Sequence, residues 1–473
     1  MKVLGAVKHV IKRILYLSHR HFIYRFEKNK KFSLDCSLWG LKINKNGHLM
    51  IGGCDCIELA KEYGTPIHVV DKKILQDNYN DFCESFKSNN INFEVFYSYK
   101  TNPVPGILKV LHDSGAGAEV ISPYELWLAF KLGVNPSSII YNGPDKSDQA
   151  LKVAIENKIK LININSFNEI ERIRNIAERL RTQVNIGVRL STSVGWADQF
   201  GLPIQSGEAF KAFERLSEIE CMNIEAVHMH LGSGFKNTFI YKKAIEDTVC
   251  FLDKLKNKLG IRIKYLDLGG GFGVSTTAVF SKFESRCHRI LNRPCSPPDI
   301  NNTPNMAIFA KKIVSTVRIE CEKLKVPLPS LIFEPGRIIT GSAQILLANV
   351  GDLKEDDAKC KFAILNAGIN IAQPATSEYH EIFVSNKMNA SYKNIYRIVG
   401  PICMVGDILY SAKKLPELNV GDVVAIMDSG AYFVPLSNNF SFPRPAVIMV
   451  SNGDHSILRE GESYEEMARL DNL

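Results

Sequence analysis

The sequence contains no apolar run that approaches the roughly 20 residues needed for a membrane-spanning helix. It also lacks a zinc-binding cysteine pattern, because its 11 cysteines are scattered and no second pair follows Cys54 and Cys56 at metal spacing. Of its 473 residues, 45% are hydrophobic and 23% are charged. These features predict a soluble protein of two or three domains, in the reducing cytoplasm, with no bound metal.

Most of the chain also carries no excess of basic over acidic residues. Residues 1–31 contain nine basic side chains and only Glu27 as an acid, so this segment accounts for the whole formal net charge of +8. The remaining basic and acidic residues cancel. We therefore expect no nucleic-acid partner for the main domains, because no basic surface would attract phosphates.

The basic leader has helical periodicity. Apolar residues recur there at steps of three and four, at Val3, Val7, Val10, Ile14 and Leu17. A basic amphipathic helix of this kind predicts peripheral contact of residues 1–31 with an anionic membrane or an acidic partner. A short docking helix or a frayed tail is an equal alternative, and an organelle-targeting peptide is a weaker one. Lys12 and Arg13 interrupt the apolar run and exclude a secretory signal.

Strand-like and helix-like segments alternate from residue 93 onward, which predicts a (β/α)8 barrel of the α/β class. The alternative is an open doubly wound sheet. Helical spacing is clear at Tyr124–Lys131, Asn168–Arg181 and Tyr241–Leu259. The eight expected strands are Val95–Tyr99, Ala118–Ile121, Ile139–Tyr141, Leu161–Asn165, Ile186–Leu190, Val227–Leu231, Tyr265–Leu268 and Leu331–Phe333.

After about residue 340 the pattern changes to strands and turns, which predicts a C-terminal all-β, barrel-like domain. We expect the strand-like Leu41–Ile43 to join it, and Val274–Thr303 to form a long loop at the active-site face of the barrel. Its expected strands are Ala343–Val350, Lys361–Leu365, Tyr396–Val399, Val423–Met427 and Ala446–Val450. The expected divisions are a leader over 1–36, a lead-in over 37–70, the barrel over 71–339 and the β-domain over 340–473.

Reactive side chains gather at the expected carboxyl ends of the strands, where barrel enzymes place their chemistry. Lys100 could form a Schiff base with an aldehyde cofactor, although a solvated lysine is commoner at a strand end. The backbone amides of Gly269, Gly270 and Gly271 could wrap a phosphate, although glycine runs often serve only as turns.

His230 could lie against a flat aromatic ring, and Glu334 could keep a pyridine nitrogen protonated so that the ring accepts electrons from Cα. That role of Glu334 favours decarboxylation, although the residue could equally pair with Arg337. His228 alternates with His230 on the expected strand, and a satisfied core histidine is the preferred interpretation of it. A metal site is geometrically possible there, but no third ligand is evident.

Seven motifs from about residue 57 to the C-terminus resemble the fold-type III pyridoxal-phosphate decarboxylases, most closely the diaminopimelate decarboxylase family. Together they are far more specific than any one of them. They are Tyr97–Asn102, His230–Ser233, Leu268–Gly273, Glu334–Arg337, Gly400–Cys403, Asp428–Tyr432 and Phe442–Pro445.

The resemblance implies pyridoxal 5′-phosphate as cofactor, with Lys100 as the Schiff-base lysine, His230 stacked on the ring and Glu334 at its nitrogen. It also implies a homodimer with shared active sites, in which Cys403 reaches the neighbouring subunit and returns a proton to the substrate carbon. Glu119 and Arg189 match positions lining the same pocket. Phosphate-binding positions are Ser233, Gly269, Gly270, Gly271, Gly336, Arg337 and Tyr432.

Two departures from the family pattern concern the substrate. Met404 stands where the family places a glutamate that grips a distal amino group, and Gln373 stands where it often has an arginine. We therefore expect an amino acid or a carrier-conjugated derivative as substrate, and not free meso-diaminopimelate. The alternatives are a true diaminopimelate decarboxylase of lysine biosynthesis and a non-catalytic regulatory homologue. Arg337, Gln373, Met404 and Asp407 are the expected substrate contacts.

Overall fold

The computed structural model describes residues 33–197, 199–281, 283–285, 288, 294–303, 305–357 and 359–472. The basic leader expected to contact a membrane or an acidic partner lies outside these residues, apart from the last few of residues 1–36. The chain divides into two compact units. The barrel unit comprises Leu75–Val274 and Asn301–Thr340, and the β unit comprises the residues up to Ile74, Ser275–Ile300 and the residues from Gly341 onward. The barrel unit is therefore inserted into the β unit.

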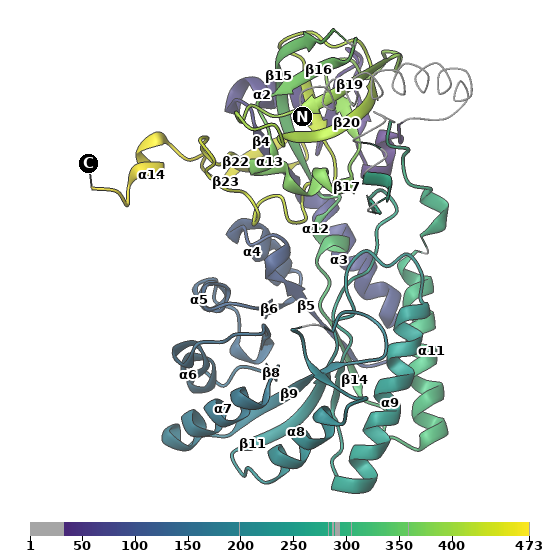
Figure 1. The fold of residues 1–473 in the computed structure, drawn as a ribbon, viewed down its shortest axis with the longest axis vertical. Coiled ribbons are helices and arrows are strands. Elements are labelled where there is room, and N and C mark those ends of the chain that lie inside the picture. Colours follow the sequence, from purple (N-terminus) through teal and green to yellow (C-terminus); the bar gives the residue numbers. More distant parts are fainter. Residues whose placement is uncertain are drawn as a thin grey trace, which may run out of the picture. The chain divides into compact units, whose positions relative to one another are not determined.

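Eight parallel strands form a closed ring in the barrel unit, in the order β9-β11-β12-β14-β5-β6-β7-β8 and back to β9 (Figure 1). The predicted barrel is confirmed, and the open-sheet alternative is wrong, because β8 and β9 pair. Short β10 (Leu202–Pro203) extends the edge of β9. The ring strands are β5 (Phe93–Ser98), β6 (Gly117–Val120), β7 (Ile139–Tyr141), β8 (Leu161–Ile164), β9 (Val184–Ser191), β11 (Met222–His228), β12 (Tyr265–Asp267) and β14 (Ser330–Phe333).

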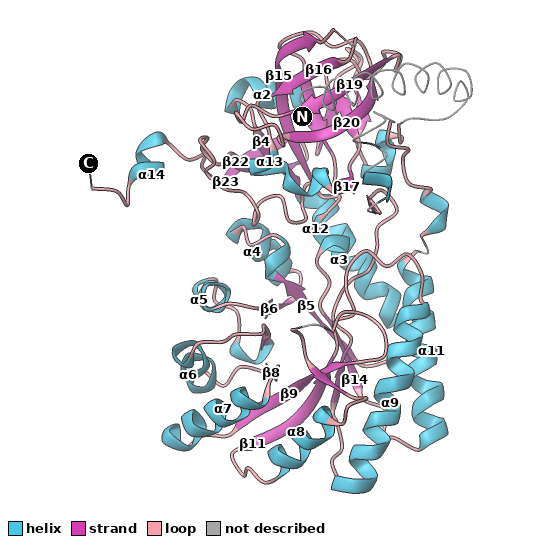
Figure 2. Cartoon of the chain, viewed as in Figure 1, coloured by secondary structure: helices cyan, strands magenta, loops and turns pink. Residues whose placement is uncertain are grey.

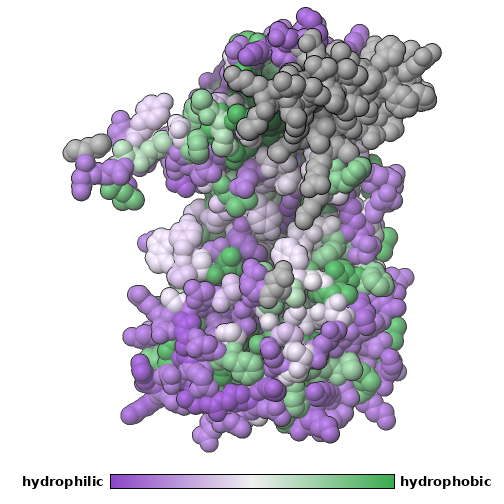
Figure 3. Space-filling model, viewed as in Figure 1, coloured by the Kyte–Doolittle hydropathy of each residue, from purple (hydrophilic) through white to green (hydrophobic). Residues whose placement is uncertain are grey.

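Helices surround this ring (Figure 2), and their sequences explain both where they begin and which face they bury. In α7, Ile170, Ile173 and Ala177 are buried at helical spacing, while the surface drawn around this helix in Figure 3 is mostly hydrophilic. Helix α7 spans Phe167–Leu180. The other helices are α3 (Lys72–Lys87), α4 (Pro105–Asp113), α5 (Pro123–Lys131), α6 (Asp148–Glu156), α8 (Glu208–Ser217), α9 (Phe239–Leu259), α11 (Met306–Leu324) and α12 (Arg337–Thr340).

The barrel interior is filled by side chains and is not a pore. A buried cluster takes one residue from each of six strands: Phe96, Ile140, Leu161, Ala226, Tyr265 and Ile332. Side chains packed in layers are typical of this architecture. The cluster closes the interior, so ligand chemistry is left to the carboxyl ends of the strands.

The β unit is built around the long strand β15 (Gln344–Glu355), which pairs in turn with β4, β21 and β16. Leu346 and Ala348 face one hydrophobic cluster, and Ile345 and Leu347 face another, as alternation along a strand requires. The other strands are β4 (Ile67–Asp71), β16 (Lys361–Leu365), β18 (Ile382–Val384), β19 (Asn394–Val399), β20 (Ile408–Leu415), β21 (Val423–Ile426), β22 (Ala446–Ser451) and β23 (Asp454–Arg459).

The lead-in, which includes the expected strand Leu41–Ile43, lies in the β unit and contributes strands to two of its sheets. Leu41–Ile43 largely forms β1 (Lys42–Ile43), but β1 pairs with β2 (Leu49–Ile51) in a small sheet completed by β3 (Cys54–Asp55). The strand that enters the large sheet is β4, between β15 and β22. All five residues of β4 are buried, so it lacks the alternation that marks a half-buried strand. Helix α2 (Cys56–Tyr63) leads into it.

Described residues of the expected loop Val274–Thr303 belong mostly to the β unit, and not to the barrel face. Strand β13 (Ala278–Val279) pairs with β17 (Glu378–Tyr379), and Cys295 is buried in a β-unit hydrophobic cluster. Thr276 donates a hydrogen bond to Asp428. Short helices in the unit include α13 (Ile369–Ala372) and α14 (Tyr464–Ala468). Among the described residues, we find no helix with the length and apolar character needed to cross a bilayer.

Candidate active site

Lys100 lies directly after β5, in the short 3-10 turn Tyr99–Thr101, and is held by a buried carboxylate. Its Nζ is 3.0 Å from Oε2 of Glu119, which is fully buried on β6. Ser98 donates a hydrogen bond of 2.5 Å to the same oxygen. The lysine side chain keeps 30% of its surface exposed. The amine is thus fixed in direction and reachable by a ligand.

Glu334 follows β14 and is only 2% exposed. Its Oε1 accepts a hydrogen bond of 2.6 Å from the Asn142 amide, while its Oε2 has no hydrogen-bond partner among the described residues. Burial favours the neutral acid, but the neighbouring His228 and Lys100 outweigh burial and hold the pKa of Glu334 well below its ordinary value. The structure therefore presents an ionised, buried acceptor with one free oxygen.

His228 is not the satisfied core histidine that the sequence favours. Neither ring nitrogen has a hydrogen-bond partner among the described residues, and Nε2 lies 3.5 Å from Oε2 of Glu334. The sequence showed no third ligand for a metal site at His228, but the structure brings one near. Ligand atoms of His228, Asp267 and Glu334 all lie within 4.8 Å of one another. Burial and the neighbouring Glu334 raise the pKa of Asp267 well above its ordinary value.

His230 lies beyond the end of β11, in the loop, because the strand ends at His228. Its Nδ1 is 4.0 Å from Oε2 of Glu334, and its ring lies 5.8 Å from that of Trp196. Burial, with Lys100 nearby, lowers the pKa of His230 to about 3. The imidazole is therefore neutral at physiological pH, as stacking on a ring requires. Arg189, at the end of β9, is also buried, with its guanidinium 4.5 Å from the Phe200 ring.

The three glycines Gly269, Gly270 and Gly271 follow β12, and neighbouring backbone packs closely against them. A Cβ on Gly270 would lie 2.4 Å from the Glu334 carbonyl, and one on Gly271 would lie 2.3 Å from that of Gly232. Gly269 has φ +62°, a left-handed conformation that favours glycine. Gly336 is equally confined, since its Cβ would lie 2.1 Å from Oγ1 of Thr101. Because glycine has no side chain, only the backbone at these positions can contact a ligand.

Of the remaining predicted phosphate positions, Ser233 is exposed in the loop after His230, and Arg337 is buried at the start of α12. Both belong to the barrel unit. Tyr432 lies in the β unit and has φ +70°, which a bulky side chain rarely adopts. Backbone strain of this kind is typical of functional positions.

Cys403 and Met404 lie on an exposed loop of the β unit, and Met404 is 41% exposed. Asp407 closes this loop: one carboxylate oxygen accepts from the Ile369 amide at 2.8 Å, and the other from the Ile402 amide at 2.9 Å. This loop-holding role is not evident from the sequence. Contact of Asp407 with substrate stays a prediction.

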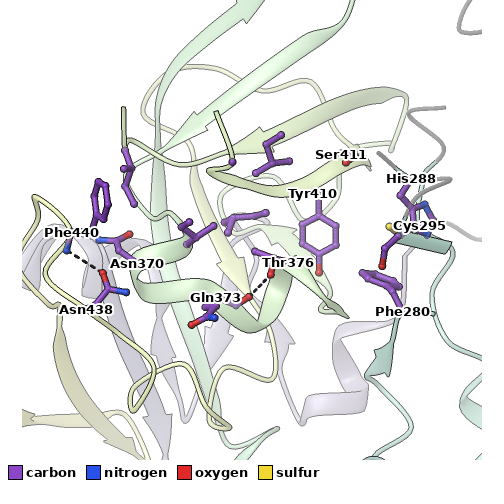
Figure 4. Close-up of a pocket in the computed structure, with 16 residues that line it drawn as sticks. Phe280, His288, Cys295, Asn370, Gln373, Thr376, Tyr410, Ser411, Asn438 and Phe440 are labelled. Carbon is purple, nitrogen blue, oxygen red and sulfur yellow. Dashed lines mark hydrogen bonds between the residues drawn. The ribbon is translucent and has the colours of Figure 1, made fainter. Parts of the chain in front are cut away.

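Gln373 lines a cavity of about 510 Å³ within the β unit. In Figure 4 its side chain lies near Thr376, whose hydroxyl donates to the Gln373 carbonyl at 2.8 Å. Tyr410, Asn370 and Cys295 line the same cavity. Among the described residues that line it, none is a lysine, arginine, aspartate or glutamate.

Two site residues escaped the sequence analysis. Asn142 follows β7 and donates to Glu119 as well as to Glu334, and Asp267 accepts a hydrogen bond from the Gly269 amide. The sequence did contain a pointer to these two residues, since both stand at the carboxyl ends of expected strands. Asparagine and aspartate are so common at strand ends that this position alone did not distinguish them.

The arrangement suits a cofactor that carries an aldehyde and a basic aromatic nitrogen. Lys100 offers an accessible amine for the aldehyde, and the free, buried Oε2 of Glu334 offers an anionic acceptor for a protonated nitrogen. Neutral His230 offers a ring face, and the glycine run offers backbone amides. Pyridoxal 5′-phosphate has this combination of groups.

Comparisons with known proteins agree with this geometry. Residues 75–341 match the family model described as pyridoxal-dependent decarboxylase, pyridoxal binding domain. The diaminopimelate decarboxylases of Methanothermobacter thermautotrophicus and Aquifex aeolicus are 31% and 30% identical, covering 92% and 89% of this chain and 97% and 95% of their own. The diaminopimelate decarboxylase of M. jannaschii, solved in complex with L-lysine, is 30% identical with a TM-score of 0.81 over 92% of this chain and 98% of that one. The chain belongs to the pyridoxal-dependent decarboxylase family, and pyridoxal 5′-phosphate is its cofactor.

Proposed function

We propose that this decarboxylase acts on free meso-diaminopimelate and releases carbon dioxide and lysine. The support is that relatives named diaminopimelate decarboxylase match nearly the whole chain, both units included. The expectation of a different substrate, drawn from Met404 and Gln373, finds no support in these comparisons. The observation that carries the chemistry is ionised Glu334 with its free, buried oxygen.

When bound, the cofactor supplies a ring that accepts the electron pair left at Cα as carbon dioxide departs. The chain's residues hold this system in place. Lys100 would anchor the aldehyde, Glu334 would keep a proton on the ring nitrogen, and neutral His230 would lie against the ring. The Gly269–Gly271 amides, Ser233, Gly336, Arg337 and Tyr432 would hold the phosphate. The carbon then needs one proton, which we assign to Cys403.

Cys403 lies on an exposed loop of the β unit, so we also propose that it serves the site of a second subunit in a homodimer. The loop beside it carries Val405, which is 97% exposed. A loop this exposed is free to reach a neighbouring subunit. A shared site would make the isolated subunit inactive.

A substrate panel tests the function. The rate of carbon dioxide release is measured with meso-diaminopimelate, L-lysine, L-ornithine, L-arginine and amino acids whose distal group is amidated or esterified. We expect kcat/KM for meso-diaminopimelate to exceed that for L-lysine by at least about 100-fold, or roughly 2.7 kcal/mol. A higher kcat/KM for any other member of the panel would contradict the proposal.

The uncharged Met404 and Gln373 favour a second candidate, an amino acid whose distal group is conjugated. The two candidates respond oppositely to charge. If meso-diaminopimelate is the substrate, Met404→Glu with Gln373→Arg keeps or raises its kcat/KM. If a conjugated substrate is used, the same change lowers kcat/KM for it and creates new activity on diaminopimelate.

A further inference from the structure

Asn142 lies between the two carboxylates that serve opposite ends of the cofactor. It follows β7 and is 4% exposed. Its Nδ2 is 2.9 Å from Oε1 of Glu119 and 2.6 Å from Oε1 of Glu334. An amide nitrogen has two protons, so each carboxylate receives one. Glu119 is the residue that holds Lys100, and Glu334 is the residue assigned to the ring nitrogen.

This arrangement requires one orientation of the Asn142 amide, and the neighbouring strand supplies it. Nδ2 of Asn163, on β8, donates to Oδ1 of Asn142 at 2.7 Å. That bond identifies the Asn142 oxygen and leaves the nitrogen facing the carboxylates. All of the hydrogen-bonding atoms of the Asn142 side chain are then engaged in a buried site, where leaving any of them without a partner is unfavourable.

The next strand leaves space for this network. Gly187 on β9 has no side chain, and a Cβ there would lie 1.8 Å from Oδ1 of Asn163. Any larger residue would displace Asn163 from Asn142. Strand β9 therefore leaves the space, β8 carries the orienting amide of Asn163, and the bridging amide of Asn142 follows β7. Glu119 lies on β6, and Glu334 follows β14 (Figure 1).

We propose that Asn142, oriented by Asn163, is a positioning residue that fixes the distance between the Lys100 anchor and the Glu334 carboxylate. Two anions that approach one neutral amide repel each other, and its two N–H groups offset that repulsion. Without these donors the two carboxylates move apart. A cofactor attached at Lys100 is then no longer held at the correct distance from Glu334.

The test uses variants of the full chain, loaded with pyridoxal 5′-phosphate. Asn142→Ala removes both donors. Asn163→Asp removes the orienting donor and faces Asn142 with an anion, which turns the amide nitrogen away from Glu119 and Glu334. Asn163→Ala only removes the orienting bond. We measure the dissociation constant of pyridoxal 5′-phosphate, the pH dependence of the absorbance of the bound cofactor and the thermal midpoint of the apoprotein.

We expect Asn142→Ala and Asn163→Asp to weaken cofactor binding at least tenfold and to shift the pH midpoint of the cofactor absorbance in the same direction. Asn163→Ala should give a smaller shift of the same sign. If the apoprotein of either of the first two variants also keeps a thermal midpoint close to that of wild type, the proposal is supported. Wild-type affinity and pH profile in both would overturn the proposal. So would loss of the folded apoprotein in both, because the amides would then serve stability alone.

Discussion

Lys100 Nζ lies 3.0 Å from Oε2 of Glu119, and the carboxylate of this pair is fully buried while the ammonium group is partly exposed. Removal of a buried carboxylate's partner costs several kcal/mol, whereas an exposed cation is readily solvated. Glu119 therefore requires a positive charge at Lys100. A protonated nitrogen in a covalent link to the cofactor would keep that charge in place.

Lys100→Ala should abolish covalent attachment of the cofactor and essentially all turnover, because the variant lacks the accessible amine at this site. The absorbance of the bound cofactor and borohydride trapping followed by peptide mapping check this expectation. Lys100→Arg is a matched control that keeps the charge beside Glu119 but cannot be trapped. Trapping at a different lysine in the alanine variant would show that the assignment is wrong.

Glu334→Gln should leave the cofactor bound but slow decarboxylation at least tenfold, equivalent to about 1.4 kcal/mol of barrier. Glutamine can still accept the Asn142 hydrogen bond, but it lacks the charge that keeps the ring nitrogen protonated. Single-turnover kinetics isolate the chemical step from product release. An unchanged single-turnover rate would remove Glu334 from the mechanism.

Cys403 provides a test of the proposed shared site. Lys100→Ala and Cys403→Ala subunits, each inactive or impaired, are mixed and allowed to exchange. Random pairing makes half of the dimers hybrid, and one of the two sites in each hybrid is intact, so about a quarter of wild-type activity should return. If confirmed subunit exchange restores nothing, Cys403 acts within its own subunit or not at all.

Glu125 makes the stability of the protein depend on pH. Burial, and then the nearby Glu119, raise its pKa from 4.5 to about 7 in the folded state. The folded protein thus binds more protons at this side chain than the unfolded chain between these values. The stabilising contribution is complete below pH 4.5 and is lost as pH rises through 7.

Glu125→Gln mimics the protonated acid and can still accept the Ile121 amide hydrogen bond. Its thermal midpoint should therefore match wild type at pH 5 and exceed it at pH 8, by up to about 3 kcal/mol in unfolding free energy. Lys109→Gln, which changes an exposed charge nearby in the sequence, is a control for general charge effects. Equal midpoints of Glu125→Gln and wild type at pH 8 would contradict a raised pKa.

For the basic leader we propose reversible contact with anionic membranes, since each basic residue near such a surface contributes roughly 1 kcal/mol. Full-length protein should sediment with phosphatidylserine vesicles at low salt, and a variant without residues 1–31 should not. Activity should survive the truncation, because every predicted site residue lies beyond it. Equal sedimentation of both proteins would exclude the membrane contact.

The sequence was sufficient to predict the barrel because each strand there is a short apolar run bounded by turns and followed by a periodic helix. It was not sufficient for β4, whose residues are all buried and whose neighbours β15 and β22 are distant in sequence. Alternation of side chains is informative only for strands with one face in water. The pairing of β13 with β17 was hidden for a similar reason, because two-residue strands leave no pattern.

Motif resemblance was sufficient to identify Lys100, His230 and Glu334 as candidates, and the structure brings them and Glu119 together. The supporting residues required coordinates. Whether His228 is a satisfied core residue depends on which atoms face its ring nitrogens, and Glu334 is 106 positions away in the chain. The same holds for Asn142, since a hydrogen bond between the ends of β7 and β14, which are three strands apart in the ring, leaves no trace in local sequence.

The position of β4 between β15 and β22 has a consequence for biosynthesis. A ribosome releases β4 before the barrel unit and completes β15 and β22 only afterwards. The barrel unit can fold during translation, but the apolar β4 has to wait for partners that are made last. Chaperone dependence should therefore be concentrated in the β unit. Nascent chains stalled before residue 446 should expose β4 to proteases and to aggregation, even when the barrel unit has already formed.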